Sequence, residues 1–177
     1  MKKLLLHCCC AVCASSVLER LENLDEYEIS VFFSNSNIMP KEEYEKRRQA
    51  LIDYLGQVHP TIQFFEDQYN NNAYCEMVKD LIAEKEGGAR CAVCINYRLQ
   101  RTAEFAKKNG FEMFSTTLTV SPHKNAELIN DLGQKIATEQ DIEFLSANFK
   151  KQNGFLRANE LSKQYNVYRQ NYCGCKF

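Results

Sequence analysis

The sequence predicts an α/β fold, Rossmann-like in its three layers, with a mostly parallel sheet. Short apolar segments rich in β-branched and aromatic residues alternate with segments of about 12–16 residues that carry helical spacing. The length of 177 residues suits one domain with its own core, and no repeat, low-complexity tract or linker is visible. We therefore expect residues 1–177 to form a single α/β domain that ends in a basic, cysteine-bearing tail.

The first half of the chain contains two clear strands. "KLLLH" at 3–7 indicates a short buried strand, and "YEISVFFS" at 27–34 is rich in β-branched and aromatic residues. Between them, residues 11–24 carry apolar side chains at helical spacing and predict a helix. Pro40, followed by two glutamates, predicts the start of a further helix that runs to about Leu55.

Glycines mark the ends of elements in the second half. Gly87-Gly88 and Asn109-Gly110 are natural helix stops. The expected elements are a strand at 61–66, helices at 74–86 and 91–108, a strand at 111–118, a helix at 124–138, a strand at 141–145 and a short helix at 160–165.

A ligand site is expected where the parallel strands end. The first strand is not followed by G-x-G-x-x-G, and the chain has no Walker lysine loop, so the usual nucleotide-binding signals are missing. Ligands in an open α/β sheet gather at the carboxyl ends of the strands. The first cysteines follow the first strand and open a helix, whose free N–H groups stabilise thiolate charge. We therefore expect a metal site at this edge.

Cysteine usage indicates a reducing compartment. The count of nine is odd, and His7 interrupts the apolar run near the start of the chain. No apolar run approaches the ~20 residues of a membrane helix. We expect a cytoplasmic protein without membrane contact, in which clustered cysteines bind metal or carry out redox chemistry.

Eight of the nine cysteines fall into three groups. The groups are Cys8-Cys9-Cys10-x-x-Cys13, Cys91-x-x-Cys94 and Cys173-x-Cys175. Cys75 stands alone in a predicted helix, and Cys8 adjoins a buried strand end. Neither of these two is expected to bind a metal.

Ligand count and spacing leave three interpretations open. Two C-x-x-C pairs, one from each of the first two groups, would hold a zinc ion. That leaves Cys9, Cys173 and Cys175 without a role, and adjacent Cys9 and Cys10 are expected to point in different directions on a regular backbone. An iron–sulfur cluster with a neighbouring metal uses the surplus thiols. A zinc-stabilised RNA-binding module and a dithiol oxidoreductase remain the alternatives.

The charge of the chain is unevenly distributed. The net charge is −1, which argues against a generic nucleic-acid binder. Residues 147–177 carry six basic residues against one acidic residue, a net +5, so residues 1–146 sum to −6. Aromatic residues interleave with this basic tail, a combination that suits RNA, although a solvated face with half-buried rings explains it as well.

Four blocks of the sequence carry a resemblance to a known family. The chain resembles the cobalamin-independent epoxyqueuosine reductases in "HCCCAVCAS", "GARCAVCINYRLQRTAEFA", "STTLTVSPHKNAELI" and "VYRQNYCGC". These blocks run from residue 7 to residue 175 in the order of the family, and "FFSNSNIMPKEEYEKR" is similar to its loop after the second strand. One C-x-x-C is a weak signal, whereas this ordered set is specific.

The resemblance implies reduction of the epoxide of epoxyqueuosine to queuosine at the wobble position of transfer RNA. It implies a [4Fe–4S] cluster with a second metal ion, iron, beside it, and no cobalamin. By motif position the metal ligands are Cys9, Cys10, Cys13, Cys91, Cys94, Cys173 and Cys175, of which Cys9, Cys10, Cys91 and Cys94 are assigned to the cluster. Val12 stands where the family usually has proline, which affects loop stiffness alone.

The implied reaction needs electrons and an acid. Reduction of an epoxide to an alkene takes two electrons and releases the oxygen as water, so a nearby group must supply protons. The expected catalytic residues are Cys173, Cys175, Tyr172 and His123, with His7 and Tyr97 as further proton-donor candidates. A low-potential cluster suits ferredoxin or flavodoxin as the electron donor.

Several residues are candidates for contact with transfer RNA. The four arginines are Arg98, Arg101, Arg157 and Arg169. Arg98 and Arg101 are expected on one helix face, where they grip phosphates or form a surface ion pair with Glu104. Residues 34–38, "SNSNI", either line the base pocket or form an ordinary turn. Tyr168 and Tyr172 either stack on the base or anchor the tail.

The cysteine assignment is testable by single substitutions. We expect alanine at Cys9, Cys10, Cys91, Cys94, Cys173 or Cys175 to abolish turnover, because each would remove a metal ligand. Cys8→Ala and Cys75→Ala serve as matched controls that keep turnover in the epoxide assay. A folded but inactive Cys75→Ala protein would contradict the assignment.

Overall fold

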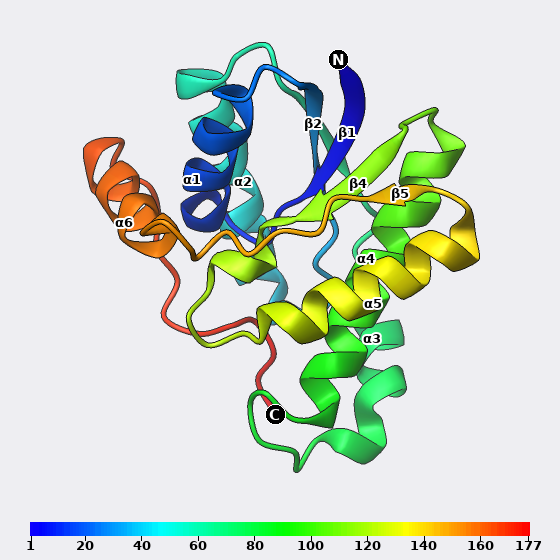
Figure 1. Cartoon of the computed structure of the whole chain (residues 1–177). Coiled ribbons are helices and arrows are strands. Elements are labelled where there is room, and N and C mark those ends of the chain that lie inside the picture. Colours follow the sequence, from blue (N-terminus) through cyan, green and yellow to red (C-terminus); the bar gives the residue numbers. More distant parts are fainter.

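The computed structural model describes all 177 residues and is built around a five-stranded sheet (Figure 1). Every neighbouring pair of strands is parallel. In order across the sheet the strands are β3 (Gln63–Glu66), β2 (Tyr27–Phe33), β1 (Lys2–His7), β4 (Met113–Thr116) and β5 (Glu143–Phe144).

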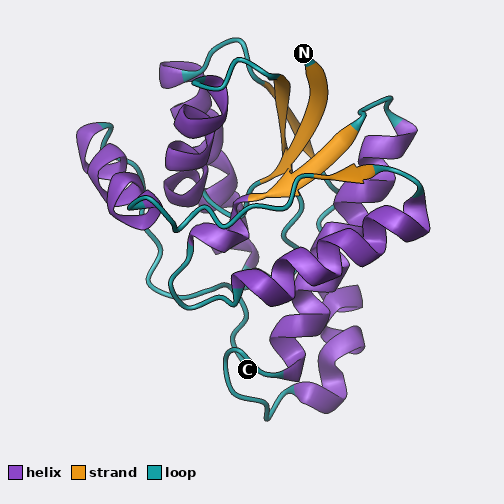
Figure 2. Cartoon of the chain, in the orientation of Figure 1, coloured by secondary structure: helices purple, strands orange, loops and turns teal.

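Helices cover both faces of the sheet and complete three layers (Figure 2). One face is covered by α1 (Ala11–Glu22), α2 (Lys41–Val58) and α6 (Gly154–Gln164), and the other by α4 (Ala89–Lys108) and α5 (Ala126–Gln140). The connections contain α3 (Asn71–Val78) and two short 3₁₀ helices, η1 (Lys79–Leu81) and η2 (Thr117–Val120). The predicted Rossmann-like α/β fold is confirmed. None of the helices has the length and apolarity needed to cross a membrane.

The central strand β1 supplies both apolar cores. Leu4 and Leu6 lie in the core formed with α1 and α2, whereas Leu5 lies in the core formed with α4 and α5. Side chains alternate along a strand, so a strand covered on both faces reads as a continuous apolar run. This burial explains why "LLL" shows no polar alternation.

The order of the strands places a crevice at the carboxyl ends of β1 and β4. The chain moves outward from β1 to β2 and β3, then crosses back to β4 and β5, so the connections after β1 and β4 diverge. The His7 ring joins the two strand ends, with Nδ1 2.9 Å from Thr116 Oγ1 and Nε2 3.1 Å from the Ser34 carbonyl oxygen. The first cysteine group therefore emerges directly into the crevice.

The helix expected at 74–86 is both earlier and shorter. The Asn70 side chain accepts a hydrogen bond from the Ala73 N–H and caps α3, which begins at Asn71. The helix ends at Val78, and Ile82 beyond it is 44% exposed, so no core stabilises a continuation. The predicted length was wrong because tertiary packing, which decides helix length, is absent in this segment.

The final helix begins six residues before the expected start, at Gly154. A Cβ at this position would lie 1.7 Å from the Phe149 carbonyl oxygen, so the chain can turn into α6 here only with glycine. The strand expected at 111–118 is also shorter, because the Thr116 hydroxyl accepts the Leu118 N–H and starts η2.

Close packing of α5 on β5 generates a stability prediction. A Cβ at Gly133 would lie 2.3 Å from the Phe144 ring, so Gly133→Ala is expected to lower the free energy of unfolding by about 1–3 kcal/mol. Gly56→Ala is the matched control, because Gly56 lies in α2 with no atom within 4 Å and alanine there favours the helix. Urea unfolding of both variants measures the difference, and equal effects would contradict the packing argument.

Candidate metal centre

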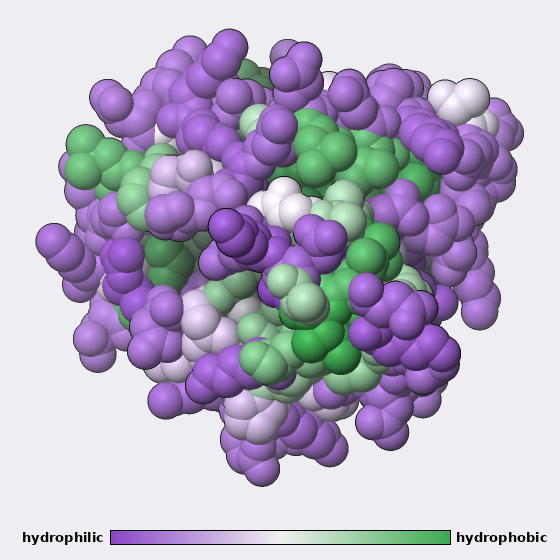
Figure 3. Space-filling model, turned by 90° about the horizontal axis from the view of Figure 1, so that it is seen from below, coloured by the Kyte–Doolittle hydropathy of each residue, from purple (hydrophilic) through white to green (hydrophobic).

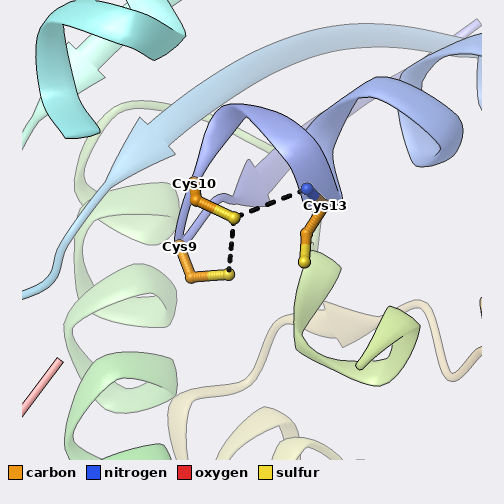
Figure 4. A group of neighbouring side chains, drawn as sticks. All are labelled: Cys9, Cys10 and Cys13. Atoms are coloured by element: carbon orange, nitrogen blue, oxygen red, sulfur yellow. Dashed lines mark hydrogen bonds between the residues drawn. The ribbon is translucent and has the colours of Figure 1, made fainter. Parts of the chain in front are cut away.

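The first cysteine group lies where β1 passes into α1. Cys10 caps α1 in an extended conformation (φ −166°, ψ 163°), and its sulfur accepts a hydrogen bond from the Cys13 N–H at 3.5 Å. The sulfurs of Cys9 and Cys10 are 3.9 Å apart, and all three lie within 4.8 Å of one another (Figure 4). The expectation that Cys9 and Cys10 point in different directions is wrong, because the strand-to-helix corner turns both sulfurs to one side.

The three sulfurs share their charge unequally. Hydrogen bonding with Cys10 and Cys13 holds the pKa of Cys9 well below its usual range, and Lys124 and Arg98 act in the same direction against burial. For Cys10, the hydrogen bond with Cys13 favours the thiolate, but the hydrogen bond with Cys9, burial and the charge on Cys9 outweigh it and raise the pKa to about 12. The group therefore concentrates negative charge on Cys9, which suits a cationic ligand.

The other two cysteine groups meet in one cavity of about 290 Å³. Cys91 and Cys94 come from the first turns of α4, and Cys173 and Cys175 come from the tail. Cys94 is buried and the other three are half-buried. Residues that are about 80 positions apart in sequence are thus brought together as four possible sulfur ligands.

A second cavity of about 370 Å³ adjoins the first and is lined by Cys9, Cys13 and Cys173. Both cavities share the side chains of Glu86, Arg98, His123, Lys124, Asn171, Tyr172 and Cys173. Figure 3 views the molecule from the side on which the strands end and shows apolar patches within a mainly hydrophilic surface. Six of the seven cysteines expected as metal ligands line these two cavities, and the seventh, Cys10, contacts Cys9. All seven therefore lie at this edge of the sheet.

The remaining two cysteines lie outside both cavity linings. Cys8 is fully buried in the apolar core, and its thiol donates to the Leu6 carbonyl oxygen at 3.6 Å. Cys75 is half-buried on α3, with its thiol 3.5 Å from Asn71 Oδ1, and it packs near Cys175. That neither residue binds a metal stays a prediction.

Arg98 is a buried cation without a carboxylate partner. Its side chain donates to the Cys94 carbonyl oxygen at 3.4 Å and to Asn35 Oδ1 at 3.5 Å, and it is 3% exposed. Burial alone would lower the pKa of Arg98, but the thiols of Cys94, Cys173 and Cys9 outweigh it and raise the pKa. A buried charge needs a counter-charge. Of these three sulfurs Cys9 has its pKa lowered, whereas burial raises the pKa of Cys94, so the thiols balance Arg98 where they are deprotonated.

The exposed location expected for Arg98 was therefore wrong. Positions three apart on a helix differ by about 60°, and this rotation turns Arg98 into the cavities while Arg101 faces outward. Arg101 donates to both oxygens of the buried Asp67, at 2.6 and 3.0 Å, and pairs with Glu104. Its charge is thus already matched by two carboxylates.

Lys124 supplies a second cation that the sequence analysis did not single out. Its ammonium group lies 3.3 Å from the Cys173 sulfur. Burial and the nearby Arg98 lower the pKa of Lys124. Cys173 and Cys9 act in the opposite direction and more strongly, so the pKa is raised overall. The sequence feature that could have indicated Lys124 is its position directly after the candidate His123, in the loop that follows η2.

Arg47, also not singled out, holds the tail in place. Its buried guanidinium donates to the carbonyl oxygens of Cys173 at 2.7 Å and Tyr172 at 3.0 Å, and pairs with Glu43 at 2.7 Å. The Tyr168 hydroxyl donates to the same Glu43 carboxylate at 3.0 Å. Arg47, itself fixed by its ion pair with Glu43, thus holds the tail at the site.

The tyrosine and glycine of "YCGC" have separate structural roles. The Tyr172 hydroxyl donates to the Met39 carbonyl oxygen at 2.6 Å, so this tyrosine anchors the tail while its ring lines both cavities. Gly174 has φ +155°, and a Cβ there would lie 2.8 Å from Asn37 Nδ2. Only glycine allows the tail to approach this closely between its two cysteines.

The other proton-donor candidates occupy different environments. His123 is exposed and lines both cavities. His7 is fully buried beneath them, and burial together with Arg98 lowers its pKa to about 4. Tyr97 lines neither cavity, and of residues 34–38 only Asn37 does.

The two arginines of the tail region differ in location. Arg157 on α6 forms ion pairs with Glu19 at 2.7 Å and Glu160 at 3.0 Å. Arg169 is exposed, lines the larger cavity and donates to the Ser162 hydroxyl at 3.1 Å. Of the four arginines expected to contact RNA, Arg169 is thus the exposed one that lines a cavity and has no carboxylate partner.

The fold and site together define a class. This is a parallel α/β protein with a thiol-rich, cation-lined ligand site at the carboxyl edge of its sheet. The sequence model of the family described as "Epoxyqueuosine reductase QueH" matches residues 4–177. The chain belongs to this family, as the four sequence blocks indicated.

Relatives from distant bacteria support the same membership. The epoxyqueuosine reductase QueH of Streptococcus pyogenes serotype M1 is 42% identical over 178 residues, which cover 98% of this chain and 69% of that protein. The Staphylococcus aureus protein of the same name is 40% identical, covering 99% and 75%. The Thermotoga maritima protein is 38% identical, covering 100% and 90%.

A solved structure shares the fold. The chain is similar, with a TM-score of 0.51, to a deacetylase of the teicoplanin biosynthesis pathway. The identity is 10%, and the alignment covers 81% of this chain and 65% of the deacetylase chain. At this identity the similarity supports the α/β layering alone.

The Asp67–Arg101 pair predicts a pH-dependent contribution to stability. Burial raises the pKa of Asp67, but hydrogen bonds from Arg101 and Ser34 outweigh it and hold the pKa below its ordinary 3.8. Arg101→Gln leaves the buried carboxylate poorly paired, at an expected cost of about 1–3 kcal/mol near neutral pH. The ionised Asp67 carboxylate stabilises the fold above pH 3.8. The difference in free energy of unfolding between Arg101→Gln and the unmodified chain therefore shrinks as the pH falls through the pKa of Asp67 in the folded state, which lies below 3.8.

Urea unfolding at several pH values measures this difference. Arg157→Gln is the control, because its ion pairs are solvent-exposed and are expected to contribute less. A loss for Arg101→Gln that is the same in acid as at neutral pH would contradict the role assigned to Asp67.

Proposed function

We propose that this chain reduces epoxyqueuosine in transfer RNA with a [4Fe–4S] cluster and an adjacent iron, both held by cysteines and without cobalamin. Family membership supports the substrate, and one structural observation carries the cofactor proposal. Arg98 is buried without a carboxylate, and Lys124 contacts Cys173, so the cations of the cavities face thiols. A thiolate-bound metal cluster is the kind of anionic group that such cations stabilise.

The residues present fit such a group. Thiolates are the soft ligands preferred by iron–sulfur clusters. Six free thiols line the two adjoining cavities, and a seventh, that of Cys10, contacts Cys9. Cys91, Cys94, Cys173 and Cys175 share one cavity, while the three sulfurs of the first group form a second set. Cys173 lines both cavities, which supports two metal-bearing groups side by side.

The overall reaction sets the demands on the protein. Both carbon–oxygen bonds of the epoxide break, an alkene forms, and the oxygen leaves as water with consumption of two electrons and two protons. The bound metals would supply the electrons one at a time and a Lewis-acidic position for the oxygen. The protein must then exclude bulk water, orient the base and deliver protons.

We propose that the proton donors are among the residues that line both cavities. The imidazole of His123 is exposed and makes no side-chain hydrogen bond, so its ring is available to donate a proton. The Tyr172 proton is already donated to the Met39 carbonyl oxygen, so we assign Tyr172 to tail anchoring and ring contact with the substrate. Lys124 holds the sulfur of Cys173 and offers a second N–H donor within the same cavity.

The macromolecular partners follow from the same site. Arg169 at the rim of the larger cavity is proposed to contact a transfer RNA phosphate. Arg157 and Arg101 already pair with carboxylates and are proposed as weaker, secondary contacts. The electron donor is proposed to be a ferredoxin or flavodoxin, because the cluster requires low-potential one-electron transfer.

Metal content is the first experiment. Anaerobically purified and reconstituted protein is expected to hold about four or more irons per chain with matching acid-labile sulfide, and to absorb near ~400 nm. Arg98→Met is expected to lower iron and sulfide content, because the cation that balances the thiolates is lost. Arg157→Met, which removes a cation away from the thiols, is the control and should retain both.

Reduction of epoxyqueuosine in transfer RNA by the loaded protein is then measured. One zinc per chain with no sulfide, after reconstitution with iron and sulfide, would contradict the proposal. The four thiols of the smaller cavity would then define a zinc site in an RNA-binding module.

A further inference from the structure

The Tyr74 hydroxyl is buried and makes no hydrogen bond of ordinary geometry, although the sulfurs of Cys94 and Cys175 lie close enough to act on it. The residue lies on α3 and is fully buried, and it lines the cavity shared by Cys91, Cys94 and Cys175. An unpaired buried hydroxyl costs about 1–3 kcal/mol, so buried tyrosines normally find a partner. The expected partner of this hydroxyl is therefore an acceptor that becomes strong when a ligand binds in the cavity.

The surroundings of Tyr74 define the chemistry of that partner. The ring packs in a small cluster with Val78 and Cys94, and Cys175 lies against the same cluster. After burial, Cys94 and Cys175 are the residues that raise the pKa of the phenol. A protonated thiol is a weak hydrogen-bond acceptor, whereas an anionic thiolate sulfur is a strong one.

We propose that Tyr74 is a positioning residue whose O–H donates to the thiolate sulfur of Cys94 or Cys175 and thereby raises the reduction potential of the metal group they hold. This inference rests on the proposed function. Reduction adds negative charge to the sulfurs, so a hydrogen bond to sulfur is stronger in the reduced state. Such contacts around metal ligands are a general means of tuning a metal site.

Tyr74 is expected to act on the metal group differently from the two cations of the site, Arg98 and Lys124. Arg98 and Lys124 bring full positive charge near Cys94, Cys173 and Cys9, and so favour binding of an anionic group in either redox state. The phenol is neutral and brings one directed donor. Its removal is therefore expected to change the reduction potential while leaving the amount of bound metal unchanged.

The experiment compares Tyr74→Phe with the unmodified chain after anaerobic reconstitution. Tyr54→Phe is the matched control, because Tyr54 is another buried tyrosine but lies near His59, away from the cavities. Iron and sulfide per chain are expected to be the same in all three proteins. A redox titration followed by electron paramagnetic resonance is expected to show an about tenfold smaller equilibrium constant for one-electron reduction in Tyr74→Phe, equivalent to about 59 mV.

A fully loaded Tyr74→Phe protein with an unchanged midpoint potential would overturn the inference. Should the variant lose iron, 3-fluorotyrosine introduced at position 74 tests the same point, because it keeps the ring and makes the O–H a stronger donor. Its midpoint potential is expected to shift upward, and an unchanged or lower value would overturn the inference. Failure of the proposed function is distinguishable, because the unmodified chain would then contain no sulfide.

Discussion

The buried positive charge of Arg98 is the constraint on which the site depends. A guanidinium with 3% exposure and no carboxylate partner is costly unless negative charge surrounds it. The thiols of Cys9, Cys94 and Cys173 come from the β1–α1 connection, α4 and the tail, and all of them act on this one group. Charge balance therefore ties together three segments of the chain that are remote in sequence.

The parallel sheet makes this convergence possible. The connections after β1 and β4 diverge at the carboxyl edge, which leaves a crevice where α1 and α4 both begin. The tail closes the crevice from the other side and is held there by the buried Arg47, which donates to two consecutive carbonyl oxygens. A rigid scaffold on one side and an anchored tail on the other bring the sulfurs together.

The polar residues of the site divide into groups with different tasks. Arg98 and Lys124 balance negative charge, whereas Arg47 and Tyr172 satisfy backbone carbonyl groups and position the tail. His123 is exposed and available for proton transfer. The Tyr74 hydroxyl is a buried donor left unpaired beside Cys94 and Cys175, which is why we assign it to their sulfurs in the metal-bound state.

The sequence by itself determined the alternation of strands and helices, the three cysteine groups and the family, because periodicity and motif order are local properties. It left open whether Tyr172 acts in catalysis, stacks on the base or anchors the tail. Only the tertiary structure decided that Arg98 turns inward, that the sulfurs of Cys9 and Cys10 converge, and that Tyr74 and Lys124 join the site. The physical reason is that the direction of a side chain depends on which face of its element is covered and on the backbone at element ends. Both are set by contacts between segments that are distant in sequence.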